Sequence, residues 1–130
     1  MEEEELVADT PRNIQDRTFE FGKRITRLVD KLPRTIAGAQ IGRQLVASGT
    51  AVGANMQEAD AAESKADFVH KTGIALKEAQ ESHYWLRLAD ATLLPNDSEV
   101  KALVQESLEL ARIVGAIKRN ARLSKPARHK

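Results

Sequence analysis

Four stretches of the chain repeat apolar or small residues at alternating steps of four and three, and this spacing constrains the fold most. The first stretch contains Ile14, Thr18, Phe21, Ile25, Leu28 and Leu32. Residues spaced in this way lie on one side of an α-helix and form a seam that packs against other helices. The pattern predicts a helix over about 14–32, with Asn13 as its N-cap and Pro33 just after its end.

Three further seams follow the first. They consist of Ile41, Leu45, Ser48, Val52 and Met56, then of Phe68, Thr72, Ala75, Ala79, Ser82, Leu86, Ala89 and Leu93, and finally of Val100, Leu103, Ser107, Leu110, Val114 and Ile117. We expect the corresponding helices over about 35–61, 65–94 and 98–121. Short connections between four helices favour antiparallel neighbours. The predicted fold is therefore all-α, an up-down-up-down four-helix bundle.

The segments between the seams carry signals for helix ends. Ser64 is followed three residues later by Asp67, a pattern similar to a capping box at the start of the third helix. Pro95 ends that helix, and Asn96 or Asp97 precedes the fourth.

The composition agrees with a helical domain. Aromatic residues make up 4% of the 130 residues, while Ala, Leu, Glu, Lys and Arg are common. The absence of cysteine excludes disulfides and thiolate-based metal sites. No apolar run is long enough to span a membrane, and the start Met-Glu-Glu-Glu-Glu is the reverse of a signal peptide. We expect a cytoplasmic protein without membrane partners.

Four glycines, Gly38, Gly42, Gly49 and Gly53, lie along one stripe of the second predicted helix. Glycine inside a helix costs about 1 kcal/mol relative to alanine, so four cost about 4 kcal/mol in a continuous helix. The close approach of another backbone or of a ligand would offset that cost. Alternatively, the helix breaks near Gly49.

Opposite charges gather at the two ends of the chain, although the net charge is only +1. Residues 1–12 form an acidic segment that we expect to be mobile, 13–122 form the bundle, and 123–130 form a basic tail. The candidate nucleic-acid ligands are Lys118, Arg119, Arg122, Lys125, Arg128 and Lys130. The alternative is a solvated terminus whose cations favour the end of a helix.

The third predicted helix carries a second seam, one residue before the first at each step. It contains Asp67, Lys71, Ile74, Glu78, Glu81, Trp85 and Leu88. One interpretation is a widened core face with glutamates at its rim. The other is an oligomer interface that includes Leu88, in which Trp85 and Ile74 are buried anchors and Glu78 and Glu81 pair with cations of a neighbour. The candidate cations are Arg43, Lys71, Lys77 and Arg87.

Catalytic and metal sites find little support in the sequence. Asp67 and His70 have the spacing of one half of a di-iron site, but His83 follows Gln80 and has no equivalent carboxylate. Glu78 and Glu81 could form an acid/base pair, yet no nucleophile or phosphate-binding loop accompanies them. We expect no enzyme activity, no metal and no cofactor.

Several of these residues stand in a recognisable order. The stretch from Gln44 to Ala59, the segment from Ser64 to Phe68 and the segment from Lys71 to Ala79 resemble the signature of the bacterial four helix bundle protein family. Its members include proteins encoded by intervening sequences in large-subunit ribosomal RNA genes. The motif positions here are Gln44, Ser48, Asn55, Glu58, Ser64, Asp67, Phe68, Lys71, Lys77, Glu78, Glu81 and Trp85.

The resemblance implies an antiparallel bundle that assembles as a ring-shaped homopentamer without catalytic activity. A similar accessory protein of diversity-generating retroelements implies contact with nucleic acid and a reverse transcriptase. We therefore expect a self-assembling bundle that binds RNA or DNA or acts as a scaffold. The alternative is an adaptor that docks on a polymerase-like enzyme without touching nucleic acid. Asn55 and Glu58 are expected to bond the turn at 61–64 or to face Lys71.

Overall fold

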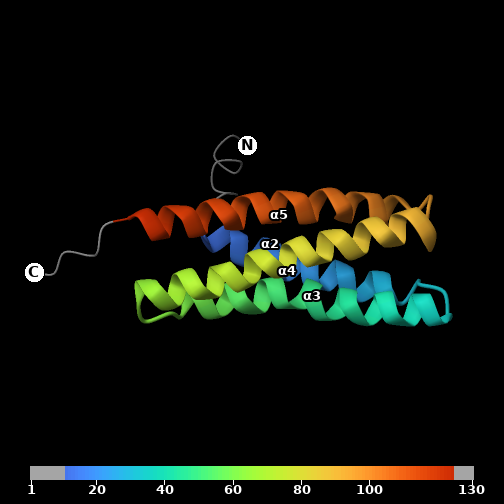
Figure 1. Ribbon diagram of the computed structural model, residues 1–130, viewed down its shortest axis with the longest axis horizontal. Helices are drawn as coiled ribbons and strands as arrows, with labels where there is room; N and C mark the ends of the chain where they lie inside the picture. The colour runs from blue at the N-terminus through green and yellow to red at the C-terminus, as the bar shows by residue number, and fades with distance from the viewer. Residues whose placement is uncertain (1–10, 125–130) are drawn as a thin grey trace, which may run out of the picture.

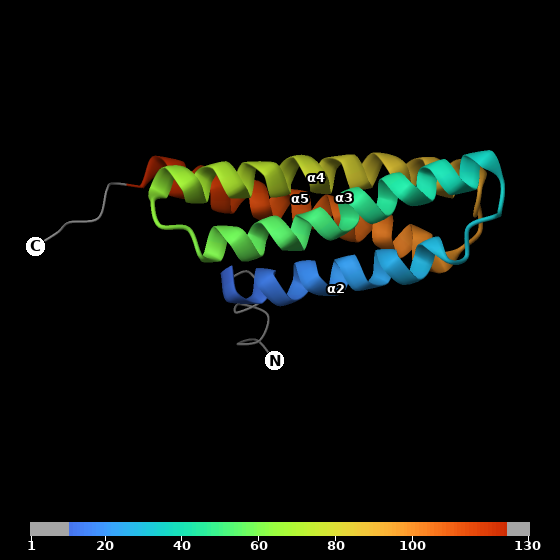
Figure 2. The same cartoon turned by 90° about the horizontal axis from the view of Figure 1, so that it is seen from below.

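The computed structural model describes residues 11–124, and this part of the chain consists of four helices without a strand. The helices are α2 (Pro11–Val29), α3 (Ile36–Asp60), α4 (Lys65–Thr92) and α5 (Ser98–Leu123). Each runs antiparallel to the next along one common direction (Figure 1). The turn between α3 and α4 lies at the same end of the bundle as the end of α5, and the other two turns lie at the opposite end (Figure 2). The predicted all-α, up-down-up-down bundle is confirmed.

The four seams form the core. Every seam residue of the first two stretches is buried, from Ile14 to Leu32 and from Ile41 to Met56. In α4 and α5 the seams are buried except at their ends, where Phe68, Leu93 and Ile117 are half-buried. The core predicted from spacing is thus confirmed, including Thr18, whose hydroxyl donates to the carbonyl oxygen of Ile14 on the preceding turn.

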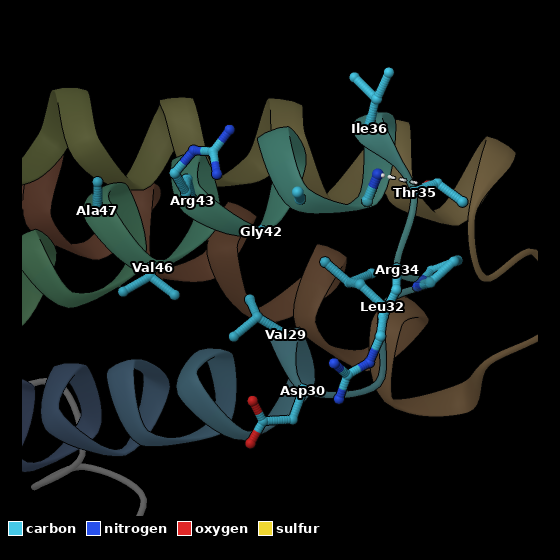
Figure 3. Close-up of a pocket in the computed structure, with 13 residues that line it drawn as sticks. Val29, Asp30, Leu32, Arg34, Thr35, Ile36, Gly42, Arg43, Val46 and Ala47 are labelled. Atoms are coloured by element: carbon cyan, nitrogen blue, oxygen red, sulfur yellow. Dashed lines mark hydrogen bonds between the residues drawn. The ribbon is translucent and has the colours of Figure 1, made fainter.

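The predicted caps are correct for α4 and α5. The side chain of Ser64 accepts from the backbone N–H of Asp67, and the carboxylate of Asp97 accepts from Glu99 and Val100. Thr35 caps α3 by accepting from the N–H of Gly38 (Figure 3). These bonds satisfy amide groups that have no partner inside the helix.

The prediction for the first helix is wrong at both ends. Its helix begins at Pro11, so Asn13 lies inside it and is not the N-cap. Proline suits the first turn of a helix, because the amide it lacks would have no intrahelical partner there. The helix ends at Val29, and Leu32 reaches the core from the following turn. The rest of the expected acidic segment, residues 1–10, lies outside the described residues.

The helix α3 is continuous through Gly49, so the alternative of a helix break near that residue is wrong. A Cβ atom added to Gly49 would lie 2.9 Å from two carbons of Ile25, and one added to Gly53 would lie 3.1 Å from the backbone oxygen of Thr18. The glycines therefore allow α2 to approach α3 closely, as their stripe suggested.

The pair α2 and α5 packs less closely than the other neighbouring pairs. Several ion pairs connect these two helices or the turns beside them, and three of these are 3.0 Å long or shorter. They are Arg17–Glu106 at 2.8 Å, Arg24–Glu99 at 2.9 Å and Lys31–Asp97 at 3.0 Å. Among the helices described, none is both long and apolar enough to cross a membrane.

Candidate interaction surfaces

The second seam of α4 lies on the side of that helix that faces α3. The ammonium group of Lys71 bonds the carboxylate of Glu58 on α3, and this bond raises the pKa of Lys71. The opposite side of α4 faces α5, where the ring of His83 bonds the Val104 carbonyl oxygen and the Ser107 hydroxyl. The second seam is therefore an outer strip beside the α3–α4 contact.

The seam residues are neither fully buried nor fully exposed. Ile74, Glu78, Trp85 and Leu88 are half-buried, and Glu81 is exposed. Trp85 and Leu88 pack against the edge of the core. The indole N–H of Trp85 donates to Glu81 at 3.1 Å, and its ring meets Tyr84 edge to face, with centroids 4.9 Å apart. One side of Trp85 thus touches the core, as in the widened-core interpretation, and its role as an interface anchor stays a prediction.

The surroundings of Glu78, near the middle of the seam, raise the pKa of its carboxyl group. Burial raises its pKa, the charge of Glu81 raises it further, and Lys77 lowers it. In the described part of the chain, no hydrogen bond or ion pair to Glu78 is present. A carboxylate held in this way is stabilised by any cation that approaches from outside.

The expected cations differ in availability. Arg43 is exposed, and its guanidinium donates to Gln40 one turn before it. Lys71 already pairs with Glu58 of its own chain, so it is less available to a neighbour. Lys77 and Arg87 are exposed, and Arg87 borders a small hollow of about 180 Å³ with Tyr84, Leu88 and Ala91.

Several polar family positions bond other residues of their own bundle. Ser82 of α4 donates to Ser48 of α3 at 2.9 Å, and both are buried. Glu58 faces Lys71 as expected. The prediction for Asn55 is wrong, because its amide donates to the carbonyl oxygen of Ala51 on its own helix and not to the following turn. Gln44 and Phe68 are half-buried, and Lys77 is exposed.

Cations gather where α5 ends beside the start of α4. Lys118 lies over Gly73, Arg119 and Arg122 are exposed, and Lys65 bonds the carbonyl oxygen of Ser124. The remaining candidate ligands, Lys125, Arg128 and Lys130, lie outside the described residues.

The outer side of the α2–α3 pair carries two hollows that the sequence reasoning did not find. The first, of about 550 Å³, lies between Gln15 and Arg27 of α2 and between Thr50 and Gln57 of α3. We call it the α2–α3 groove. The second, of about 1200 Å³, continues toward the turn at 30–35. There Val29 and Val46 both project between the helices, while Ile36 points outward (Figure 3). The sequence carries a signal for the α2 side alone, in the four-residue steps from Thr18 to Gly22 and Thr26 and in Phe19, an aromatic residue outside the first seam.

The described side chains form no cluster typical of a metal site. In residues 11–124 no three acidic, histidine or cysteine residues gather in a way that could hold a metal ion. Asp67 and His70 do not acquire the two further carboxylates that a di-iron site needs.

The fold and surfaces define a class of protein: an antiparallel four-helix bundle whose candidate interaction surfaces lie on its outer faces and at one end. Residues 12–116 match the family model described as 23S rRNA-intervening sequence protein. The chain belongs to that family, which the sequence resemblance had indicated.

A solved relative agrees with this assignment. It is a protein of unknown function of the S23 ribosomal protein family from Bacteroides thetaiotaomicron, with 33% sequence identity and a TM-score of 0.74. The match covers 84% of this chain and 97% of that one. A comparison with curated proteins found no match.

Proposed function

We propose that this protein is a non-catalytic bundle that assembles with copies of itself, as a ring-shaped homopentamer, and acts as a scaffold. The observation that carries the proposal is the outer strip of α4. A half-buried tryptophan there lies beside a leucine and two carboxylates, of which Glu78 has a raised pKa and no partner within the described chain. Large aromatic side chains are enriched as anchors at protein interfaces, and polar and charged groups are typical of the rim around them.

Replacing Trp85 by Asp tests the proposal. The variant should behave as a single chain of 14.4 kDa in light scattering, while the wild type has a mass several times larger. Gln80→Asp is the matched control, because Gln80 is exposed on α4 outside the strip and should not affect assembly. A monomeric wild type would refute self-assembly.

A second variant separates assembly from folding, because Trp85 also contacts the core. Glu81 is exposed, so Glu81→Lys should leave the helix content measured by circular dichroism unchanged. If Glu81 meets cations of a neighbour, the reversed charge should weaken assembly. If the Trp85→Asp variant and the Glu81→Lys variant both assemble like the wild type, the strip is a widened core face and not an interface.

The cations beside the end of α5 favour RNA as the partner of this assembly. Arg119 and Arg122 are exposed, and Lys118 lies beside them over α4. A ring repeats this cluster in every copy, so modest charges become a multivalent surface for phosphates. Single- and double-stranded RNA should be retained at low salt by the wild type, and more weakly by the variant in which Lys118, Arg119 and Arg122 are replaced by Gln. Equal retention would favour the alternative, an adaptor that binds a polymerase-like protein.

A further inference from the structure

The α2–α3 groove combines apolar walls with positive charge. Its floor and sides are formed by Thr18, Gly22, Gly53 and Ala54, and Phe19 stands at its rim with 71% of its surface exposed. Among the described residues that line it, the charged ones are Lys23 and Arg27. Lys23 pairs with Glu20 one turn before it, whereas no ion pair of Arg27 is present in the described part of the chain. A partner that fits this groove is apolar and carries carboxylates.

The outer strip of α4 has the complementary chemistry. From Ile74 to Trp85 it presents two large apolar side chains with Glu78 and Glu81 between them, and no cation stands within this part of the strip. The nearest cation, Lys77, lies on the adjoining side and is exposed. A strip of this composition in one copy matches the basic, apolar groove of another.

The groove and the strip also lie at the same level along the bundle. Ser48 bonds Ser82, and Gly22 packs against the neighbouring residues Gly49 and Thr50, so Gly22 and Ser82 share a level across three helices. Toward one end, Gln15 bonds the carbonyl oxygen of Met56, close to where Glu58 pairs with Lys71.

Both α2 and α4 run antiparallel to α3, so they run in the same direction (Figure 2). The stretch from Gln15 to Arg27 therefore covers the same length of the bundle as the stretch from Ile74 to Trp85. Lys23 comes within one helical turn of the level of Glu81.

This arrangement decides what kind of assembly the contact can build. The groove and the strip lie on neighbouring sides of the bundle, because both border α3. A contact between two different surfaces is heterologous, and it closes into a ring when successive copies are related by rotation alone. Equal levels require no shift along the axis, and surfaces on neighbouring sides rotate each copy relative to the one before it. A small closed ring results, rather than a filament.

We propose that the α2–α3 groove of one copy receives the outer strip of α4 from the next copy, with Lys23 and Arg27 facing Glu78 and Glu81. The inference rests on the proposed self-assembly and adds the receiving surface, which nothing in the strip itself specifies. It also makes the contact directional, since each copy contributes a groove on one side and a strip on the other.

Cross-linking tests the direction of the contact, and the chain's lack of cysteine makes introduced thiols unique. Lys23→Cys and Glu81→Cys are combined in one full-length chain and treated with a short bis-maleimide. We expect a ladder of covalent oligomers that ends at the ring, whereas each single-cysteine variant should stay a single chain. Ala102→Cys with Glu81→Cys is the matched control, because Ala102 is exposed on α5 away from both surfaces, and it should give no ladder.

Two results would overturn the inference while leaving self-assembly intact. Dimers from Glu81→Cys alone would mean that two α4 strips meet each other. Absence of a ladder from the double variant, in a protein that light scattering shows to be assembled, would place the receiving surface elsewhere.

A negative charge introduced into the groove is a second test of the inference, with the mass of the assembly as the measurement. Ala54 is exposed and lines the groove, so Ala54→Glu should preserve helix content, yet its carboxylate would meet Glu78 and Glu81 of the neighbour. We expect the mass to fall to that of one chain, and Ala102→Glu to assemble normally. If Ala54→Glu assembles like the wild type, the groove is free for another occupant, such as the acidic residues Glu2 to Glu5, and the inference is wrong.

Discussion

At the scale of single residues, a hydrogen bond between two buried serines helps to hold α3 against α4. Ser48 and Ser82 are 1% and 0% exposed, and their hydroxyls lie 2.9 Å apart in a seam otherwise rich in alanine. A buried hydroxyl needs a partner, so this pair favours the observed level of the two helices over any shifted one. The proposed match between groove and strip depends on that level.

Ser82→Ala should therefore destabilise the fold. It removes the donor to Ser48 and leaves a buried oxygen without its partner, at a cost of about 1–3 kcal/mol in the free energy of unfolding. Urea denaturation measures this change. The double variant Ser48→Ala/Ser82→Ala should cost less than the sum of the two single changes, because neither orphaned group remains. Strict additivity would show that the two hydroxyls do not interact.

Asp97 gives a prediction that depends on pH. The hydrogen bond from the Val100 N–H and the neighbouring Lys31 hold the pKa of Asp97 below its ordinary value of 3.8. Since folding lowers this pKa, the stabilisation is fully present above 3.8 and is lost as the pH falls from that value through the lower pKa of the folded state. Asp97→Ala should cost about 1 kcal/mol near neutral pH and less in acid. Asp97→Asn keeps an acceptor oxygen, so in urea titrations it should retain much of the cap with a smaller pH dependence.

At the scale of helices, α3 shows why small residues stand inside a long helix. Its glycines do not share one role. Gly38 lies so close to the Pro33 carbonyl oxygen that an added Cβ would be 2.0 Å away, whereas at Gly42 the nearest atom, of Leu32, would be 3.4 Å away. The first position has no room for a side chain, and the second has ordinary contact distance.

Alanine substitutions should separate these roles. Gly42→Ala is expected to raise the free energy of unfolding by up to about 1 kcal/mol, because alanine favours the helix and meets no obstacle. Gly49→Ala should lower it, since the methyl group would lie 2.9 Å from two carbons of Ile25. Thermal unfolding of both variants provides the measurement, with each serving as the control of the other. Stabilisation by both would mean that α2 moves away at little cost.

The four helices could be predicted because a repeat of four and three is a local property of the chain. Even Thr18, Ser48 and Ser107, which are polar, were placed in the core by their spacing alone. The start of α2 was missed, since an asparagine before an apolar run suggests a cap while Pro11 suits a first turn equally well. The bond of Asn55 was missed because an amide on α3 can reach its own preceding turn as easily as the next helix.

At the scale of the molecule, the strip on α4 was visible in the sequence but the groove was not. A strip lies on one helix, so its spacing reveals it. The groove needs Phe19 and Gly22 from α2 beside Thr50 and Gly53 from α3, and only the packing of the two helices brings these residues together. Their shared level with Ile74 and Trp85 is likewise a property of the packed bundle. Where a partner binds thus depends on how helices pair, which periodicity does not specify.

Assembly and RNA binding should be linked through charge. Each copy contributes its own cationic end, so a ring contacts more phosphates than one chain does, and the affinity of the ring should fall more steeply with salt. We expect the Glu81→Lys monomer to bind RNA more weakly than the wild type and to show a shallower slope of log affinity against log salt. The substitution removes one negative charge and adds one positive charge, so the net charge of each chain rises by two and weaker binding cannot come from it. Fluorescence anisotropy with one labelled RNA at several salt concentrations measures both quantities. Equal slopes for ring and monomer would mean that a single copy makes all the phosphate contacts, and the scaffold would then act on something other than RNA.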